Sequence, residues 1–436
     1  MRARAAAAAA AAAAVAAAAT TPGELSDPTI CDALGIRDVT PFMAALPLGA
    51  SPYGAKSASP IFLPLYASSA PWAAGAPPNA SITSAVVFLH GLKGNANSYF
   101  CQGLSATLAA ARGSTLVLAP WLGNVSVTGR EWAGLDDGSA SLYWSVTRWT
   151  HGGNASPGPN GNDPPVKFST SFDALDAIVA ALTAAAAADG ALPALRLITV
   201  AGFSAGAQLA QRWGFARKVA AAGAGAGGAL LRVLVSDPGS YAYLSPDRPA
   251  ASCSPLHDTG TDWACDSFAP PPSDSECLAT YDAWKYGVSS GLDDNLYILP
   301  LASDAAALAA QVADYPNRDI RYVLGSHDAC NCNTAGFSND DKSCVFAGQS
   351  CSPNAYGPPG CCDTYPDSTS ENVMDVTCEG MLQGSNRLQR GRNFGSHLAA
   401  TYPGFAPRLA SFDGGHDAGA FFRSPEFAAW AFDAGA

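Results

Sequence analysis

Residues 202–206 read Gly-Phe-Ser-Ala-Gly, and the central Ser204 is a candidate nucleophile. A serine hydroxyl reacts poorly at neutral pH, so it needs a base within hydrogen-bond reach and a carboxylate that fixes the tautomer of that base. The Gly-x-Ser-x-Gly pattern is weak by itself, because residues 287–291 also match it. Ser204, however, follows a β-branched apolar run and precedes helix-forming residues, whereas no strand pattern precedes Ser289, which is interpreted as a loop serine.

The chain has 6 histidines, and His416 is the candidate base. It lies between a strand-like run and a final helix, beside glycines that let its loop reach toward the serine. His397 lies within a predicted helix, far from any strand end, and is expected to be solvated or to cap that helix. His90 is expected to be structural, and His327 to lie in a loop or at the surface.

The acid should close the strand that precedes the histidine, in the chain order serine, acid, histidine. Asp328 follows the apolar run 320–324 and is our candidate. Asp237, after the run 231–235, is the alternative, because some serine hydrolases take the acid from that earlier strand. The oxyanion of a tetrahedral intermediate also needs N–H donors, for which we predict the backbone amides of Ala205 and Leu92.

These candidates depend on elements that bring strand ends together. Short apolar runs alternate with helical stretches, which predicts an α/β fold with a mostly parallel twisted sheet and helices on both faces. A capping box of Thr170 and Asp173 marks the start of one helix. The predicted strands are 85–89, 115–119, 197–200, 231–235, 320–324 and 408–412, and the predicted helices are 172–188, 205–215 and 301–313.

Residues 20–436 are predicted to form one domain with irregular insertions at about 244–298 and 329–380. Seven of the 12 cysteines lie from Cys330 to Cys378, which favours disulfides of open connectivity. The pairs Cys330/Cys332 and Cys361/Cys362 lack the spacing of a zinc site, so no metal is predicted. The aromatic residues of 121–167 either line a cleft or pack in the core.

The chain has 436 residues, of which 48% are hydrophobic and 14% charged, and its net charge is −12. This composition suits a large core and argues against nucleic acid or fixed polyanions as partners. Residues 1–19, with Arg2, Arg4 and an alanine run, are predicted to be a secretory signal; an organelle transit peptide and a low-complexity tract are the alternatives. Beyond that run no segment is apolar for long enough to span a membrane.

The even cysteine count and three sequons, at Asn79, Asn124 and Asn154, favour an extracellular protein or, alternatively, an organelle lumen.

The combination of His90-Gly91, the 202–206 motif, Asp328 and His416 resembles the α/β-hydrolase superfamily over about residues 84–427. A weaker resemblance is to secreted esterases of the polyester-depolymerase and feruloyl-esterase kind, and residues 240–249 and 284–287 are similar to uncharacterised secreted fungal hydrolases. The cysteine-rich stretch directly after Asp328 departs from the usual short acid loop. The resemblance implies an acyl-enzyme on Ser204, proton transfer by His416 and no cofactor.

The function predicted from these features is hydrolysis of a small or polymeric carboxylic ester. A peptidase of the same fold is one alternative, since amides and esters are cleaved by the same three groups. A catalytically silent binding or adhesion module is another, although such modules usually lose the serine or the histidine, and both are present here.

Overall fold

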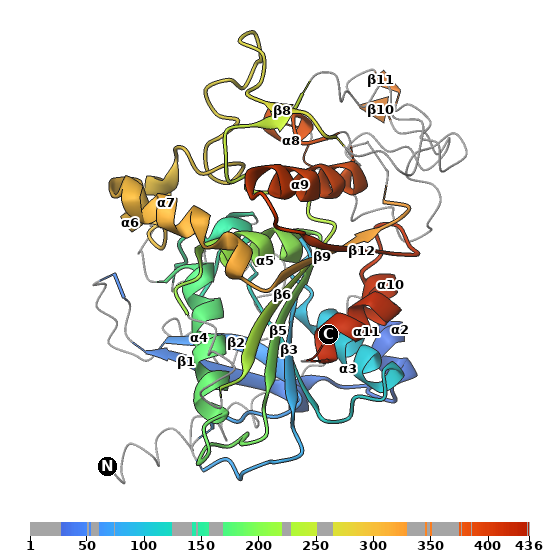
Figure 1. The fold of residues 1–436 in the computed structure, drawn as a ribbon. Coiled ribbons are helices and arrows are strands. Elements are labelled where there is room, and N and C mark those ends of the chain that lie inside the picture. The colour runs from blue at the N-terminus through green and yellow to red at the C-terminus, as the bar shows by residue number, and fades with distance from the viewer. Residues whose placement is uncertain are drawn as a thin grey trace. The chain divides into compact units, whose positions relative to one another are not determined.

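Eight strands form one mostly parallel sheet in the computed structural model (Figure 1). The structure describes residues 28–49, 52–53, 61–73, 75–123, 142–144, 147–156, 169–219, 228–250, 265–328, 345–346, 349–350, 375, 377–384, 386–433 and 435. In sheet order the strands are β1 (Met43–Gly49), β2 (Ile61–Ala67), β4 (Thr115–Pro120), β3 (Ser84–Leu89), β5 (Leu197–Phe203), β6 (Leu230–Ser236), β9 (Ile320–Gly325) and β12 (Arg408–Phe412). Strand β2 is antiparallel to both β1 and β4, whereas β3 and β4, β6 and β9, and β9 and β12 pair in parallel.

All six predicted strands are present, and the predicted α/β fold with a mostly parallel sheet is confirmed. Strands β3, β4, β5 and β9 are buried along their whole length. This burial explains why they read as continuous apolar runs rather than as alternating patterns. The antiparallel pair β1 and β2 was not predicted from the sequence.

The helices are α2 (Pro28–Ala33), α3 (Ala96–Ala109), α4 (Ser171–Ala185), α5 (Ala205–Ala216), α6 (Leu299–Ser303), α7 (Ala305–Ala313), α8 (Cys378–Met381), α9 (Arg387–Thr401), α10 (Ala418–Arg423) and α11 (Pro425–Phe432). Short 3-10 turns occur at η1 (Thr40–Phe42), η2 (Arg148–His151), η5 (Leu292–Asp294) and η6 (Tyr315–Asn317). The capping box of Thr170 and Asp173 opens α4 as predicted. The predicted helix 301–313 is two helices, because Asp304 caps the start of α7 by accepting two backbone N–H groups.

The chain divides into two compact units. Unit 1 comprises residues 1–201, 217–232 and 428–436, and unit 2 comprises residues 202–216 and 233–427. Within unit 1, Trp121, Tyr143, Trp144 and Trp149 are buried, so these residues of the predicted aromatic loop pack in the core. Trp132 lies outside the described residues.

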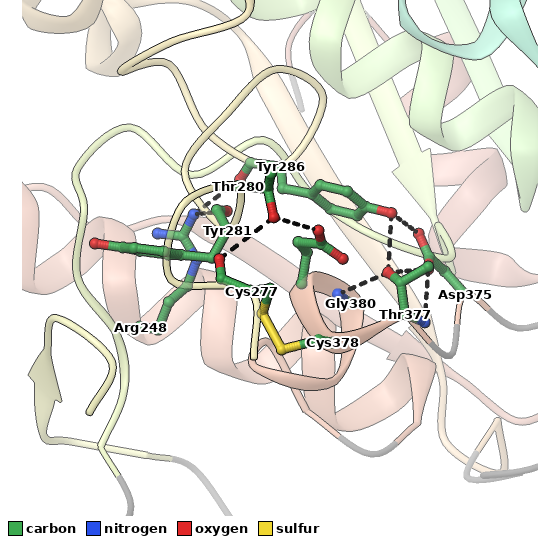
Figure 2. Close-up of a disulfide and its surroundings, with 10 residues drawn as sticks. Arg248, Cys277, Thr280, Tyr281, Tyr286, Asp375, Thr377, Cys378 and Gly380 are labelled. Atoms are coloured by element: carbon green, nitrogen blue, oxygen red, sulfur yellow. Dashed lines mark hydrogen bonds between the residues drawn. A yellow bond between two sulfur atoms is a disulfide. The ribbon is translucent and has the colours of Figure 1, made fainter. Parts of the chain in front are cut away.

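Two disulfides join described residues. Cys31–Cys101 links α2 to α3 in unit 1, and Cys277–Cys378 lies in unit 2 (Figure 2). Cys265 is disulfide-bonded as well. Figure 2 shows that Cys277–Cys378 connects the two predicted insertions, and the Tyr286 hydroxyl donates to Asp375 across the same junction at 2.8 Å.

Small strands occupy parts of both predicted insertions: β7 (Arg248–Pro249) with β8 (Phe268–Ala269), and β10 (Val345–Phe346) with β11 (Gln349–Ser350). The predicted signal 1–19, the Asn124 sequon and the pairs Cys330/Cys332 and Cys361/Cys362 lie outside the described residues. Within the described part of the chain, no helix is long and apolar enough to cross a membrane.

Candidate active site

Ser204 occupies a sharp turn between β5 and α5. Its φ of +57° is a left-handed conformation that few residues other than glycine adopt, and its N–H donates to the Ser236 carbonyl at 3.0 Å. A Cβ on Gly202 would overlap the Gly206 carbonyl and lie 2.6 Å from the Ala207 nitrogen. The turn therefore needs glycine at position 202, as predicted for a strained strand–serine–helix turn that lifts the hydroxyl off the sheet.

Gly202→Ala is expected to destabilise the protein and to reduce reaction at Ser204, because the added methyl group would collide with rigid backbone rather than with a movable side chain. The loss of stability should be about 2–4 kcal/mol, measured by denaturant unfolding. Gly113→Ala is the matched control, because nothing lies within 4 Å of its added Cβ. Equal unfolding midpoints for the two variants would contradict the need for glycine at position 202.

His416 lies in the loop between β12 and α10, with its Nε2 2.9 Å from Ser204 Oγ. Its side chain is almost fully buried and packs against the Phe203 ring, with the ring centroids 4.7 Å apart. The loop comes very close to the end of β9, because a Cβ on Gly325 would lie 2.8 Å from the Gly414 carbonyl oxygen. Glycine at the end of β9 thus lets the two loops meet.

Asp328 lies in the turn after β9, and its Oδ2 is 2.6 Å from His416 Nδ1. The carboxyl group is fully buried. Burial alone would raise the pKa of Asp328, but the facing charges of His416 and Arg387 outweigh it and hold the pKa below its ordinary value. An ionised Asp328 accepts the hydrogen on Nδ1, which leaves Nε2 free to accept the Ser204 hydroxyl proton.

The alternative acid, Asp237, has different partners. It follows β6 at a φ of +50°, and its oxygens accept the Gly325 N–H at 3.0 and 3.1 Å and the Ser236 hydroxyl at 3.2 Å. Burial, followed by the negative charge of Asp328, raises the pKa of Asp237 well above its ordinary value. The structure brings His416 to Asp328, whereas Asp237 lies beside that pair as a second buried carboxyl group.

Arg387, the first residue of α9, is a member of the site that the sequence did not reveal. Its Nη1 is 3.7 Å from Asp328 Oδ1, and both side chains are at most 1% exposed. The Leu388 N–H, one residue further on, donates to the Asp328 carbonyl at 3.0 Å. Helix α9 therefore holds Asp328 through both its backbone and its charge.

The two predicted oxyanion donors lie in different units. Ala205 is the first residue of α5, so its N–H has no acceptor within the helix and lies next to the serine in sequence. Leu92 lies in a turn after β3, in unit 1, and its role stays a prediction. His90 is structural, as predicted: its Nε2 accepts the Leu122 N–H at 2.9 Å, and burial lowers its pKa to about 4.

The prediction of a solvated or capping His397 is wrong. His397 lies in α9 but is buried, with its ring 4.5 Å from that of Tyr243. Burial, followed by the charge of Arg248, lowers its pKa to about 3. His327 is partly exposed beside Asp413, and Ser289 is an exposed loop residue that contacts Asp282, both as predicted.

No family model matches the chain, and no curated protein matches it. Among solved structures, it is similar to poly(aspartic acid) hydrolase-1 from Sphingomonas sp. KT-1, with 16% identity and a TM-score of 0.44 over 86% of this chain and 94% of that one. It is also similar to LpqC, a poly(3-hydroxybutyrate) depolymerase from Bordetella parapertussis, with 16% identity and a TM-score of 0.41 over 86% of this chain and 88% of that one. A third similar structure is the siderophore hydrolase EstB from Aspergillus nidulans, with 11% identity and a TM-score of 0.35 over 91% of this chain and 96% of that one.

Proposed function

We propose that the protein is a serine hydrolase that cleaves carboxylic esters. The observation that supports this most directly is the unbroken hydrogen-bonded series Ser204 Oγ, His416 and Asp328, with distances of 2.9 and 2.6 Å. The left-handed turn at Ser204, at the start of α5, adds to this support, since the N-terminus of the helix favours developing negative charge.

In the proposed reaction, Ser204 Oγ attacks the ester carbonyl carbon while its proton moves to His416 Nε2. The imidazolium, stabilised by ionised Asp328, then returns that proton to the departing alkoxide oxygen, and the C–O bond breaks to leave an acyl-serine. Water, deprotonated by His416, attacks this acyl group and releases the carboxylic acid and the free serine. We assign the oxyanion to the backbone amide of Ala205, and the Leu92 amide stays the second donor predicted from the sequence.

Labelling with a fluorophosphonate probe, followed by mass spectrometry of the modified peptide, tests this proposal. We expect the label on Ser204, none on Ser204→Ala, and turnover of short-chain aryl esters. Equal labelling of the two proteins would reject Ser204 as the nucleophile. A parallel panel of peptide substrates separates esterase from peptidase, and the absence of all turnover together with the absence of labelling would favour a binding module.

We also propose that the protein is secreted after removal of residues 1–19. The disulfides Cys31–Cys101 and Cys277–Cys378 support an oxidising compartment. Protein recovered from the culture medium of a secreting host should begin near Thr20 on N-terminal sequencing. Retention in the cells with an intact N-terminus would contradict the proposal.

A further inference from the structure

Three charged or ionisable groups surround the buried Asp328 carboxyl group. His416 faces it from the loop after β12, Arg387 from α9, and Asp237 from the end of β6. The Tyr241 phenol is nearby and stays neutral, because burial and then the two carboxyl groups raise its pKa. Two buried carboxylates next to each other repel strongly, and a buried guanidinium needs a counter-charge. The protonation state of each carboxyl group therefore depends on its neighbours.

We propose that Arg387 is a positioning residue that keeps Asp328 ionised and turned toward His416. This inference rests on the proposed function, because it assigns a role in the hydrolytic reaction to a residue that does not touch the substrate.

The contacts favour an ionised Asp328. Arg387 makes its ion pair with Asp328, whereas Asp237 accepts hydrogen bonds from the neutral Gly325 amide and the Ser236 hydroxyl. The directions of the two pKa shifts agree: that of Asp328 lies below its ordinary value and that of Asp237 well above it. Two carboxyl groups whose environments separate them in this way take different roles, one ionised and one neutral.

The proposed role has a measurable consequence for pH dependence. His416 must be neutral to accept the serine proton, so activity falls as the Asp328–His416 pair takes up a proton at low pH. The positive charge of Arg387 opposes that proton. Without it the pair binds the proton more readily, and the acid limb of the kcat/KM profile moves to higher pH.

The experiment compares Arg387→Gln, Arg387→Lys and Arg390→Gln, using kcat/KM for a short-chain aryl ester against pH together with thermal unfolding. Arg390 is the matched control: it is equally buried in the same helix, but it donates to the Gly384 and Gly239 carbonyls. We expect Arg387→Gln to move the acid limb up by about 1 pH unit, since an opposite charge at this distance shifts a carboxyl group by about that much or more. Arg387→Lys keeps the positive charge, so its acid limb should lie close to that of the wild type. Arg390→Gln should lower the unfolding temperature without moving the acid limb.

If Arg387→Gln does not fold, Arg387→Met takes its place, because an apolar side chain of similar length fills the buried space without unpaired polar groups, and the limb should again move to higher pH. An unmoved limb in a folded Arg387→Gln enzyme, or an equal shift in Arg390→Gln, would overturn the role of Arg387. Failure of the proposed function looks different: Ser204→Ala would then keep wild-type labelling and turnover, whatever the behaviour of Arg387.

Discussion

Ser204→Ala is expected to lower kcat for short-chain aryl esters by about 10⁶-fold, and His416→Ala by a similar factor. The reason is that the two side chains act as a unit, joined by a 2.9 Å hydrogen bond, so the loss of either removes nucleophilic attack. The double variant should be no slower than either single variant, because what remains comes from binding and oxyanion stabilisation. Steady-state kinetics on the three variants measures this.

Ser289→Ala is the control for the first prediction, since Ser289 sits in the second Gly-x-Ser-x-Gly match but in an exposed loop. It should keep wild-type kcat. Losses that add up in the Ser204 and His416 double variant would show that the two residues act independently. A loss of kcat in Ser289→Ala equal to that in Ser204→Ala would contradict the assignment of Ser204 as the only nucleophile candidate.

Asp328→Asn is expected to lower kcat by about 10⁴-fold, whereas Asp237→Asn should stay within about threefold of the wild type. An asparagine at position 328 cannot accept the Nδ1 hydrogen as a carboxylate does, and its amide can hold the imidazole in the wrong tautomer. At position 237 the amide replaces a carboxyl group that we expect to be protonated, so the charge near His416 does not change. The kcat values of both variants, measured at the pH optimum, decide between the two acids.

Asp237→Asn also reports on folding, which separates loss of chemistry from loss of structure. Its side-chain oxygen can still accept the Gly325 N–H, so circular dichroism and the unfolding temperature should remain close to those of the wild type. A large kinetic loss in a well-folded Asp237→Asn protein, together with an active Asp328→Asn protein, would make Asp237 the acid.

The sequence predicted those strands whose burial leaves a simple pattern. Strand β5 is buried throughout and reads as one apolar run, and β12 was predicted with its observed bounds. The pair β1 and β2 was missed because each strand contains a proline, Pro47 or Pro64, that interrupts a strand pattern. The 301–313 segment was predicted as one helix because apolar periodicity continues across Asp304, although its side chain caps a new helix there.

Some residues of the candidate site could likewise be predicted from the sequence, and others could not. Ser204, Asp328 and His416 each follow a strand, so strand ends and chain order were enough to select them. Arg387 could not be found, because it begins a helix rich in polar residues that reads as solvated, and its burial depends on contacts distant in sequence. His397 was misjudged for the same reason: Tyr243, which covers its ring, comes from the segment after β6.

The hydrogen bond from the Leu388 amide to the Asp328 carbonyl joins the two residues that flank the long segment 329–387. Asp328 is therefore held by a backbone hydrogen bond from a residue that follows this segment in the sequence. Lengthening such a loop twofold costs only about 0.6 kcal/mol in closure entropy. We therefore expect changes of length between residues 329 and 374, which leave the Cys277–Cys378 disulfide and the Tyr286–Asp375 hydrogen bond in place, to preserve the contact between Asp328 and His416.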